Sequence, residues 1–199
     1  MDKQKQLEEL QQTLGQIYLK NIEFFKKNHI NIYEKIVFFE KQNIQNYSLE
    51  FINDEFKLLD LKTKQDLYKK EPFSDSLDRV NNFLLSNAFT LIKMEELKKK
   101  NHYEDEINSY IYLNEYIKKF ENIEIKINKF IFIGTLLGVH LNDFHNSLNA
   151  KSYLIIEPNI EIFRLSLFLC DYESLSKNSK LFFAISVDSF NLESIAKKF

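Results

Sequence analysis

The sequence predicts an α/β fold built from two parts. Residues 1–72 are predicted to form helices and a small antiparallel β-meander, and residues 73–199 a helical pair followed by a βαβαβ unit with a parallel sheet. Three observations support this: helical spacing of apolar residues near the N-terminus, alternation of apolar and polar residues after it, and three continuous β-prone runs in the last third. We expect the two parts to pack as one compact lobe of a longer protein.

The N-terminal segment is predicted to be helical over residues 5–27, because apolar residues recur there at steps of three and four. These residues are Leu7, Leu10, Leu14 and Ile17. Gly15 interrupts the pattern and costs about 1 kcal/mol relative to Ala. A second, short helix is expected over residues 30–40.

The antiparallel meander is predicted over residues 47–68, with alternation of apolar and polar residues over 47–52 and again from residue 55. Asn53-Asp54 separates these two strands and is typical of a tight turn. A further turn is expected at Thr63-Lys64 before a third strand at residues 66–68, and Pro72 is expected to end the meander.

Two helices are predicted between the meander and the last third. We expect Ser74 to cap the N-terminus of the first helix, since serine is a preferred N-cap residue. The carboxylates of Asp75 and Asp78 would add to this, because negative charge is favourable near the positive N-terminal end of a helix. That helix continues to about residue 97, and the second runs from about 103 to 120. The segment 123–127 alternates and is either an edge strand or the end of the second helix.

The last third predicts a Rossmann-like unit, because three buried strands alternate with two helices. The strands are expected at residues 130–133, 153–156 and 181–185, and the helices at residues 135–148 and 160–170. Continuous apolar runs of this kind are typical of parallel strands that are buried on both faces.

One feature of this unit has the form of a ligand site. In Rossmann-like units the first strand–helix turn carries glycines that let the backbone approach a phosphate, and an acid after the second strand binds ribose hydroxyls. Here Gly134 and Gly138 frame the turn, and Glu157 follows 23 residues after Gly134. These three residues are the candidate cofactor-binding residues. The alternative is that the glycines only permit a tight turn and close packing of helix against strand, since Leu136 would fill the ligand space.

The composition excludes several classes of function. The net charge is −2, from 27 basic and 29 acidic side chains, so no basic field indicates a nucleic-acid partner. The longest apolar stretch, residues 130–141, is shorter than the roughly 20 residues needed to span a bilayer. The charged N-terminus and the single cysteine, Cys170, favour a cytoplasmic location. His140 and His145 lack the spacing of zinc ligands, and no motif indicates a catalytic or metal-binding set.

Two segments of the last third resemble the motility accessory factor family of Campylobacter, Helicobacter and related bacteria. They are residues 132–141 and residues 154–168, in which Ile-Ile-Glu-Pro-Asn followed by Glu-Ile-Phe-Arg-Leu-Ser-Leu-Phe is the most specific part. Residues 47–51 and 58–62 also resemble the family's small β-meander. The turn between Gly134 and Gly138 departs from the family, in which it is richer in glycine.

The resemblance implies a part of a flagellin glycosyltransferase. Members of the family transfer nonulosonic acids, such as pseudaminic or legionaminic acid, from a nucleotide-activated sugar to Ser or Thr of flagellin. Their transferase domain lies downstream of the matched region, so the resemblance implies a non-catalytic N-terminal domain without a cofactor or catalytic residue of its own. Its expected partners are flagellin and the downstream transferase domain, and its expected role is scaffolding or flagellin recognition.

Two other functions remain open from the sequence. One is a small nucleotide- or S-adenosylmethionine-binding domain of the methyltransferase type, which would use Gly134, Gly138 and Glu157. The other is a homo-oligomerisation module built on the N-terminal helix. We expect no nucleic-acid partner and no membrane association in any of the three cases.

Overall fold

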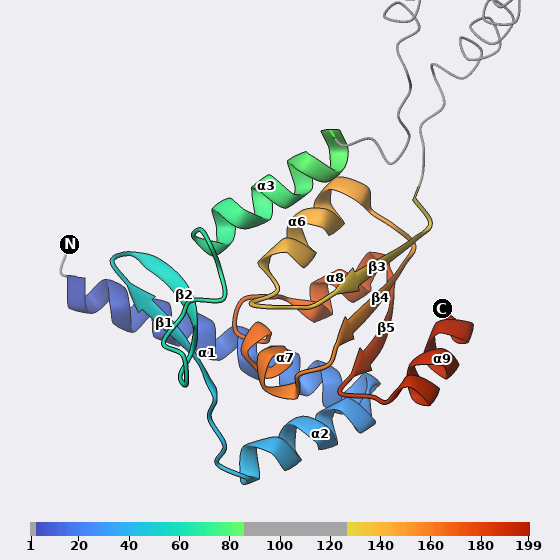
Figure 1. The fold of residues 1–199 in the computed structure, drawn as a ribbon, viewed down its shortest axis with the longest axis horizontal. Helices are drawn as coiled ribbons and strands as arrows, with labels where there is room; N and C mark the ends of the chain where they lie inside the picture. The colour runs from blue at the N-terminus through green and yellow to red at the C-terminus, as the bar shows by residue number, and fades with distance from the viewer. Residues whose placement is uncertain (1–2, 86–126) are drawn as a thin grey trace, which may run out of the picture. The chain divides into compact units, whose positions relative to one another are not determined.

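The computed structural model describes residues 3–85 and 127–199, and within these ranges the protein is a mixed α/β fold (Figure 1). Its elements, in chain order, are α1 (Lys3–Asn28), α2 (Ile30–Lys41), β1 (Tyr47–Ile52), β2 (Glu55–Asp60), α3 (Pro72–Leu85), β3 (Lys129–Ile133), α6 (Val139–Leu148), β4 (Ser152–Glu157), α7 (Ile160–Ser166), α8 (Tyr172–Asn178), β5 (Lys180–Ile185) and α9 (Ser189–Lys198). The predicted fold class is confirmed. The expectations for residues 86–97, 103–120 and 123–126 lie outside the described residues.

The parallel sheet has the strand order β3-β4-β5, and all three predicted strands are confirmed. One face carries large aromatic side chains, with Phe132 against Phe144 of α6 and Phe183 against Phe25 of α1. The ring of Phe182, on the other face, packs edge-on against Phe199 just after α9. Helices thus lie on both faces of the sheet, as is usual for parallel strands. The prediction that all three strands are buried on both faces is wrong for β3, where Ile131 and Ile133 are 48% and 82% exposed. Among the described residues, the helix on that face, α9, packs against β5 instead.

The meander is a two-stranded antiparallel hairpin, β1–β2, with Asn53-Asp54 at its turn as predicted. Both turn residues have positive φ, 54° and 64°, which suits the tight turns that join antiparallel strands. In place of a third strand, a single bridge joins Leu59 to Asp66.

Three helix boundaries differ from the prediction. α3 begins at Pro72 rather than after Ser74, because the Glu71 carboxylate already accepts the N–H of Ser74 at 2.9 Å. α6 begins at Val139 rather than at residue 135, because residues 135–138 form the turn. α7 ends at Ser166 instead of Cys170. The sequence reasoning did not predict α8 and α9 at all.

The core joins the first helix to the last third of the chain. The Phe25 ring is fully buried and contacts Phe163, Tyr172 and Phe183, with centroids 5.1–5.5 Å apart. The amide of Asn21, also fully buried, donates to the carbonyls of Leu167 and Cys170 and accepts the N–H of Tyr172. These bonds satisfy the backbone between α7 and α8, where the helical pattern is interrupted.

The described residues up to Val80 and from Ile127 onward pack as one compact unit, which holds both sheets. The division of the chain at residues 72 and 73 stays a prediction.

Candidate functional site

The turn between β3 and α6 is held in an unusual backbone conformation. Gly134, Leu136 and Gly138 all have positive φ, at 83°, 45° and 76°. The Gly134 N–H donates to the carbonyl of Ile156 on β4 at 2.8 Å, so the turn starts in register with the neighbouring strand. The turn therefore lies at the carboxyl end of the sheet, which is where α/β proteins bind ligands.

Glu157 lies beside this turn, as its position after the second strand predicts. Its Oε2 accepts the backbone N–H of Thr135 at 2.7 Å and the Thr135 hydroxyl at 3.0 Å. Its Oε1 accepts the N–H of Asn159 at 2.9 Å. The side chain is only 4% exposed, so both oxygens are committed to donors of the chain itself.

The rest of the turn is also filled by the protein. The Tyr68 hydroxyl accepts the N–H of Leu137 at 3.0 Å, and burial raises the pKa of this phenol to about 12. A Cβ added to Gly138 would lie 2.5 Å from the Cβ of Cys170 and 3.3 Å from that of Ser166. The missing side chain of Gly138 is therefore what allows α6 to start against the end of α7.

His140 closes the same region from α6. Its ring is buried, hydrogen-bonds to the backbone of Gly134 and packs edge-on against Phe132. Desolvation, with a smaller contribution from the positive charge of Arg79, lowers its pKa to about 4. It is therefore a neutral structural side chain at neutral pH.

The three predicted site residues are thus brought together around one turn, and the chain's own groups occupy the positions nearest to Gly138 and Glu157. Ligand binding at this turn stays a prediction. Tyr68 and Cys170, which complete the turn, come from segments that no motif connects to it, so the sequence offered no signal for them.

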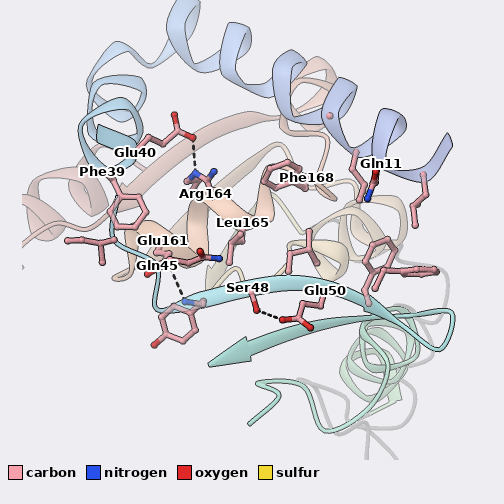
Figure 2. Close-up of a pocket in the computed structure, with 18 of the residues that line it drawn as sticks. Gln11, Phe39, Glu40, Gln45, Ser48, Glu50, Glu161, Arg164, Leu165 and Phe168 are labelled. Atoms are coloured by element: carbon pink, nitrogen blue, oxygen red, sulfur yellow. Dashed lines mark hydrogen bonds and ion pairs between the residues drawn. The ribbon is translucent and has the colours of Figure 1, made fainter. Parts of the chain in front are cut away.

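A second region is an open pocket of about 750 Å³ that lies along α7 and the residues that follow it. It lies between the first half of α1, the end of α2, β1 and one side of α7, as Figure 2 shows. Its lining is mixed, with apolar residues from α1 and β1 and charged residues from α2 and α7. The lining residues used below are Leu10, Leu14, Gly15, Glu40, Leu49, Glu50, Phe51, Arg164 and Phe168.

Arg164 is the one described basic side chain that lines this pocket. Its Nε donates to Glu40 Oε1 at 2.8 Å, and Tyr18 donates its hydroxyl to the same carboxylate. The guanidinium lies over the Tyr18 and Phe168 rings, which are stacked at 4.5 Å. Burial, and then the Glu40 carboxylate, raise the pKa of Tyr18. Arg164, Glu40 and the two rings therefore form one fixed side of the pocket, on which the positive and negative charges are paired with each other.

Glu161 attaches the β1–β2 hairpin to α7. Its Oε1 accepts the backbone N–H of Asn46 at 2.7 Å and of Tyr47 at 2.9 Å, and its Oε2 accepts the Asn46 side-chain amide at 3.0 Å. The side chain is only 3% exposed. The hairpin is thus fixed at its first residue, and the rest of β1 borders the pocket.

Over residues 3–85 and 127–199, no group of three His, Cys, Asp or Glu side chains is placed to hold a metal ion. Within the same ranges, no helix combines the length and apolarity that crossing a bilayer would demand.

One family model matches most of the chain, and one solved structure shares its fold. Residues 17–192 match the family model described as the glycosyltransferase Maf N-terminal domain. A solved structure of MAf glycosyltransferase from Magnetospirillum magneticum AMB-1 is similar in fold, with a TM-score of 0.60 and 14% identity over 92% of this chain. This chain spans 30% of the length of that protein. No curated protein matches the sequence significantly.

Proposed function

This chain belongs to the glycosyltransferase Maf N-terminal domain family, and from that premise we propose that it is a non-catalytic part of a flagellin glycosyltransferase. In this proposal the whole protein transfers a nonulosonic acid, such as pseudaminic or legionaminic acid, to Ser or Thr of flagellin. The domain described here recognises flagellin and serves as a scaffold for the transferase domain. It has no cofactor of its own.

The observation that carries the non-catalytic role is the closed turn. A nucleotide at this turn would need the Thr135 N–H and a free Glu157 carboxylate, and these two groups are bonded to each other. Displacing a buried carboxylate from its donors costs about 1.5–3 kcal/mol for each hydrogen bond. The flagellin-recognition role draws instead on the open pocket beside β1, which has room for a ligand and whose charged wall is already paired.

A second candidate function is favoured by the position of Glu157. It follows the second strand of the Rossmann-like unit and lies beside the first turn, as the acid of a nucleotide- or S-adenosylmethionine-binding domain does. In that case Gly134, Gly138 and Glu157 would form the site after Glu157 released Thr135.

Calorimetric titration distinguishes the two candidates. We expect no heat of binding when the protein is titrated with CMP or with S-adenosylmethionine. Micromolar binding that Glu157→Gln abolishes would establish the second candidate and refute the non-catalytic role. Because Glu157→Gln also removes a hydrogen-bonded carboxylate, the variant is expected to be less stable than the wild type. The thermal unfolding midpoint of the variant is therefore measured first, and the titrations are run well below that temperature.

Flagellin binding tests the recognition role. We expect unglycosylated flagellin from the same bacterium to bind the immobilised 199-residue chain. Serum albumin serves as the control for non-specific retention. If the chain retains flagellin no better than albumin, the recognition role is refuted and the scaffold role is left.

A further inference from the structure

The β1–β2 hairpin has two outer edges, and one of them is covered by the chain itself. Along β2, the Asp60 N–H donates to the carbonyl of Gln65 at 2.9 Å, and the Leu58 carbonyl accepts the N–H of Leu67 at 2.8 Å. The segment that follows β2 therefore satisfies the outward backbone groups of Leu58 and Asp60.

The same bonds fix the direction of the backbone groups on β1. In an antiparallel pair, hydrogen-bonded and non-hydrogen-bonded pairs alternate, and both residues of a non-hydrogen-bonded pair direct their N–H and C=O outward. Leu58 and Asp60 point outward, so their partners Leu49 and Tyr47 do too. Phe51, two residues after Leu49, follows the same alternation.

This outer edge of β1 is largely unpaired. Its first donor, the Tyr47 N–H, is taken by Glu161. Within the described residues no hydrogen bond is made by the N–H of Leu49 or of Phe51. An edge with free, alternating N–H and C=O groups is a template on which another extended chain can pair.

The open edge borders the 750 Å³ pocket rather than bulk surface. Leu49 and Phe51 line the pocket from β1, while Leu10 and Leu14 line it from α1. Figure 2 shows the ring of Phe168, two residues after the end of α7, between α1 and β1. A strand paired with β1 would thus direct every second side chain towards these apolar groups, which is the pattern of strand addition to a sheet edge.

The charges around the pocket restrict what can enter. Arg164 is already paired with Glu40, and the Glu161 carboxylate is committed to the backbone before β1. Glu50 remains, hydrogen-bonded only to the neutral hydroxyl of Ser48. The net excess of carboxylates disfavours an acidic ligand and favours a neutral or basic one.

We propose that the outer edge of β1 binds an extended peptide segment of the acceptor protein as a third strand of the hairpin. The segment has apolar residues at alternating positions and lacks acidic residues. This inference rests on the proposed function for the identity of the acceptor, flagellin. Its geometry rests on the open edge and the pocket alone.

Gly15 provides a test that separates binding from folding. It lies on α1 in the pocket lining, and a Cβ added there meets no atom within 4 Å. Gly15→Leu therefore adds a branched side chain at the pocket lining, at a position where the Cβ meets no atom, while Gly15→Ala adds one methyl group. Both substitutions favour the helix, so neither is expected to lower the unfolding midpoint. We expect Gly15→Leu to weaken the binding of unglycosylated flagellin at least tenfold and Gly15→Ala to leave it within about twofold.

Phe51 provides a second test, directed at the backbone. Phe51→Pro removes an outward N–H that β2 does not use, and Phe51→Ala removes the same aromatic ring but keeps the N–H. Proline is tolerated on the free side of an edge strand. We expect the proline variant to bind flagellin at least tenfold more weakly than the alanine variant. In the wild-type complex, amide hydrogen exchange at Leu49 and Phe51 is expected to slow.

The probes are flagellin itself and a panel of overlapping synthetic peptides that covers its sequence. If flagellin binds all variants equally, the strand-addition proposal is wrong and the recognition role stands. If flagellin fails to bind but panel peptides bind in a manner sensitive to Gly15→Leu, the recognition role is wrong and strand addition stands. If neither probe binds the wild-type chain, both are refuted.

Discussion

The β3–α6 turn and the pocket beside α7 differ in how the chain uses its polar groups. Before the helix, Glu157 turns inward and uses both oxygens on donors around the β3–α6 turn. Along the helix, Glu161 and Arg164 are likewise bonded, but they border a pocket of about 750 Å³ beside an open strand edge. The β3–α6 turn, which has the sequence pattern of a ligand site, is filled by the chain's own groups. The pocket beside β1, which has no such pattern, is open.

This difference shows that the spacing of glycines and an acidic residue in the sequence is not sufficient for a ligand site. A glycine-framed turn and an acid at the right interval set up a ligand site only if their donors and acceptors stay available. Around Gly138 the space is taken by Cys170, whereas around Gly15 it is empty. Substitutions at matched positions in the two regions should therefore have opposite effects on stability.

The largest expected effect is at the closed turn. Gly138→Ala forces a Cβ to within 2.5 Å of the Cys170 Cβ at a φ of 76°, and we expect it to lower the free energy of unfolding by about 4 kcal/mol. Urea denaturation measures this change. Gly134→Ala is the matched control, since its φ is 83° but no atom lies within 4 Å, and it should cost only about 1–2 kcal/mol. Equal losses for the two variants would show that the space around Gly138 is not closed.

Acid should also destabilise the closed region, through His140. Its pKa is about 4 in the folded protein, below the ordinary value of 6.5, so the unfolded chain binds the proton more readily. Stability is fully present above pH 6.5 and falls as the pH drops towards 4, by about 3 kcal/mol at most. Urea midpoints across this range, compared with those of His140→Gln, isolate the contribution, because burial lowers the pKa of His29 and His145 as well. A pH dependence unchanged by the substitution would contradict the assignment.

A smaller loss is expected from Tyr68→Phe. The substitution keeps the packing of the ring but leaves the buried N–H of Leu137 without its acceptor at 3.0 Å. The expected destabilisation is about 1–2 kcal/mol, measured by thermal or urea unfolding. A variant as stable as the wild type would mean that water replaces the hydroxyl and that the turn is less closed than described here.

The smallest effect should have the opposite sign and lies in the open region. Gly15→Ala is expected to raise the free energy of unfolding by up to about 1 kcal/mol, because the added methyl group meets no atom and favours the helix. Thermal unfolding measures the gain. A loss of stability would indicate that the space beside Gly15 is needed by the folded chain itself.

The sequence predicted those parts of the fold that depend on local pattern. The three parallel strands and the Asn53-Asp54 turn follow from continuous apolar runs and turn chemistry, and all were confirmed. The start of α3 was misplaced because Glu71, rather than Ser74, caps it, and an acidic N-cap before proline was not considered. α8 was missed because its seven residues carry only two apolar side chains, Tyr172 and Leu175. α9 was overlooked although Leu192, Ile195 and Phe199 have helical spacing and Asp188 caps the helix by accepting the N–H of Asn191.

For the candidate site, the sequence could predict which residues surround the turn but not which residues fill it. The spacing of Gly134, Gly138 and Glu157 correctly placed these residues around one turn. What fills the turn comes from Tyr68 and Cys170, whose approach depends on tertiary packing and leaves no local signal. The pocket was missed for the same reason, because α1, β1 and α7 meet there from distant parts of the sequence.

The buried amide of Asn21 has a consequence for how the protein is made. Its partners Leu167 and Cys170 lie 146 and 149 residues further along the chain. Ribosomes add about 5–20 residues per second, so the partners of Asn21 are synthesised roughly 7–30 s after Asn21 itself. During translation its apolar side, which includes Leu10 and Leu14, has no native cover. The pocket beside β1 is therefore among the last parts of the domain to form.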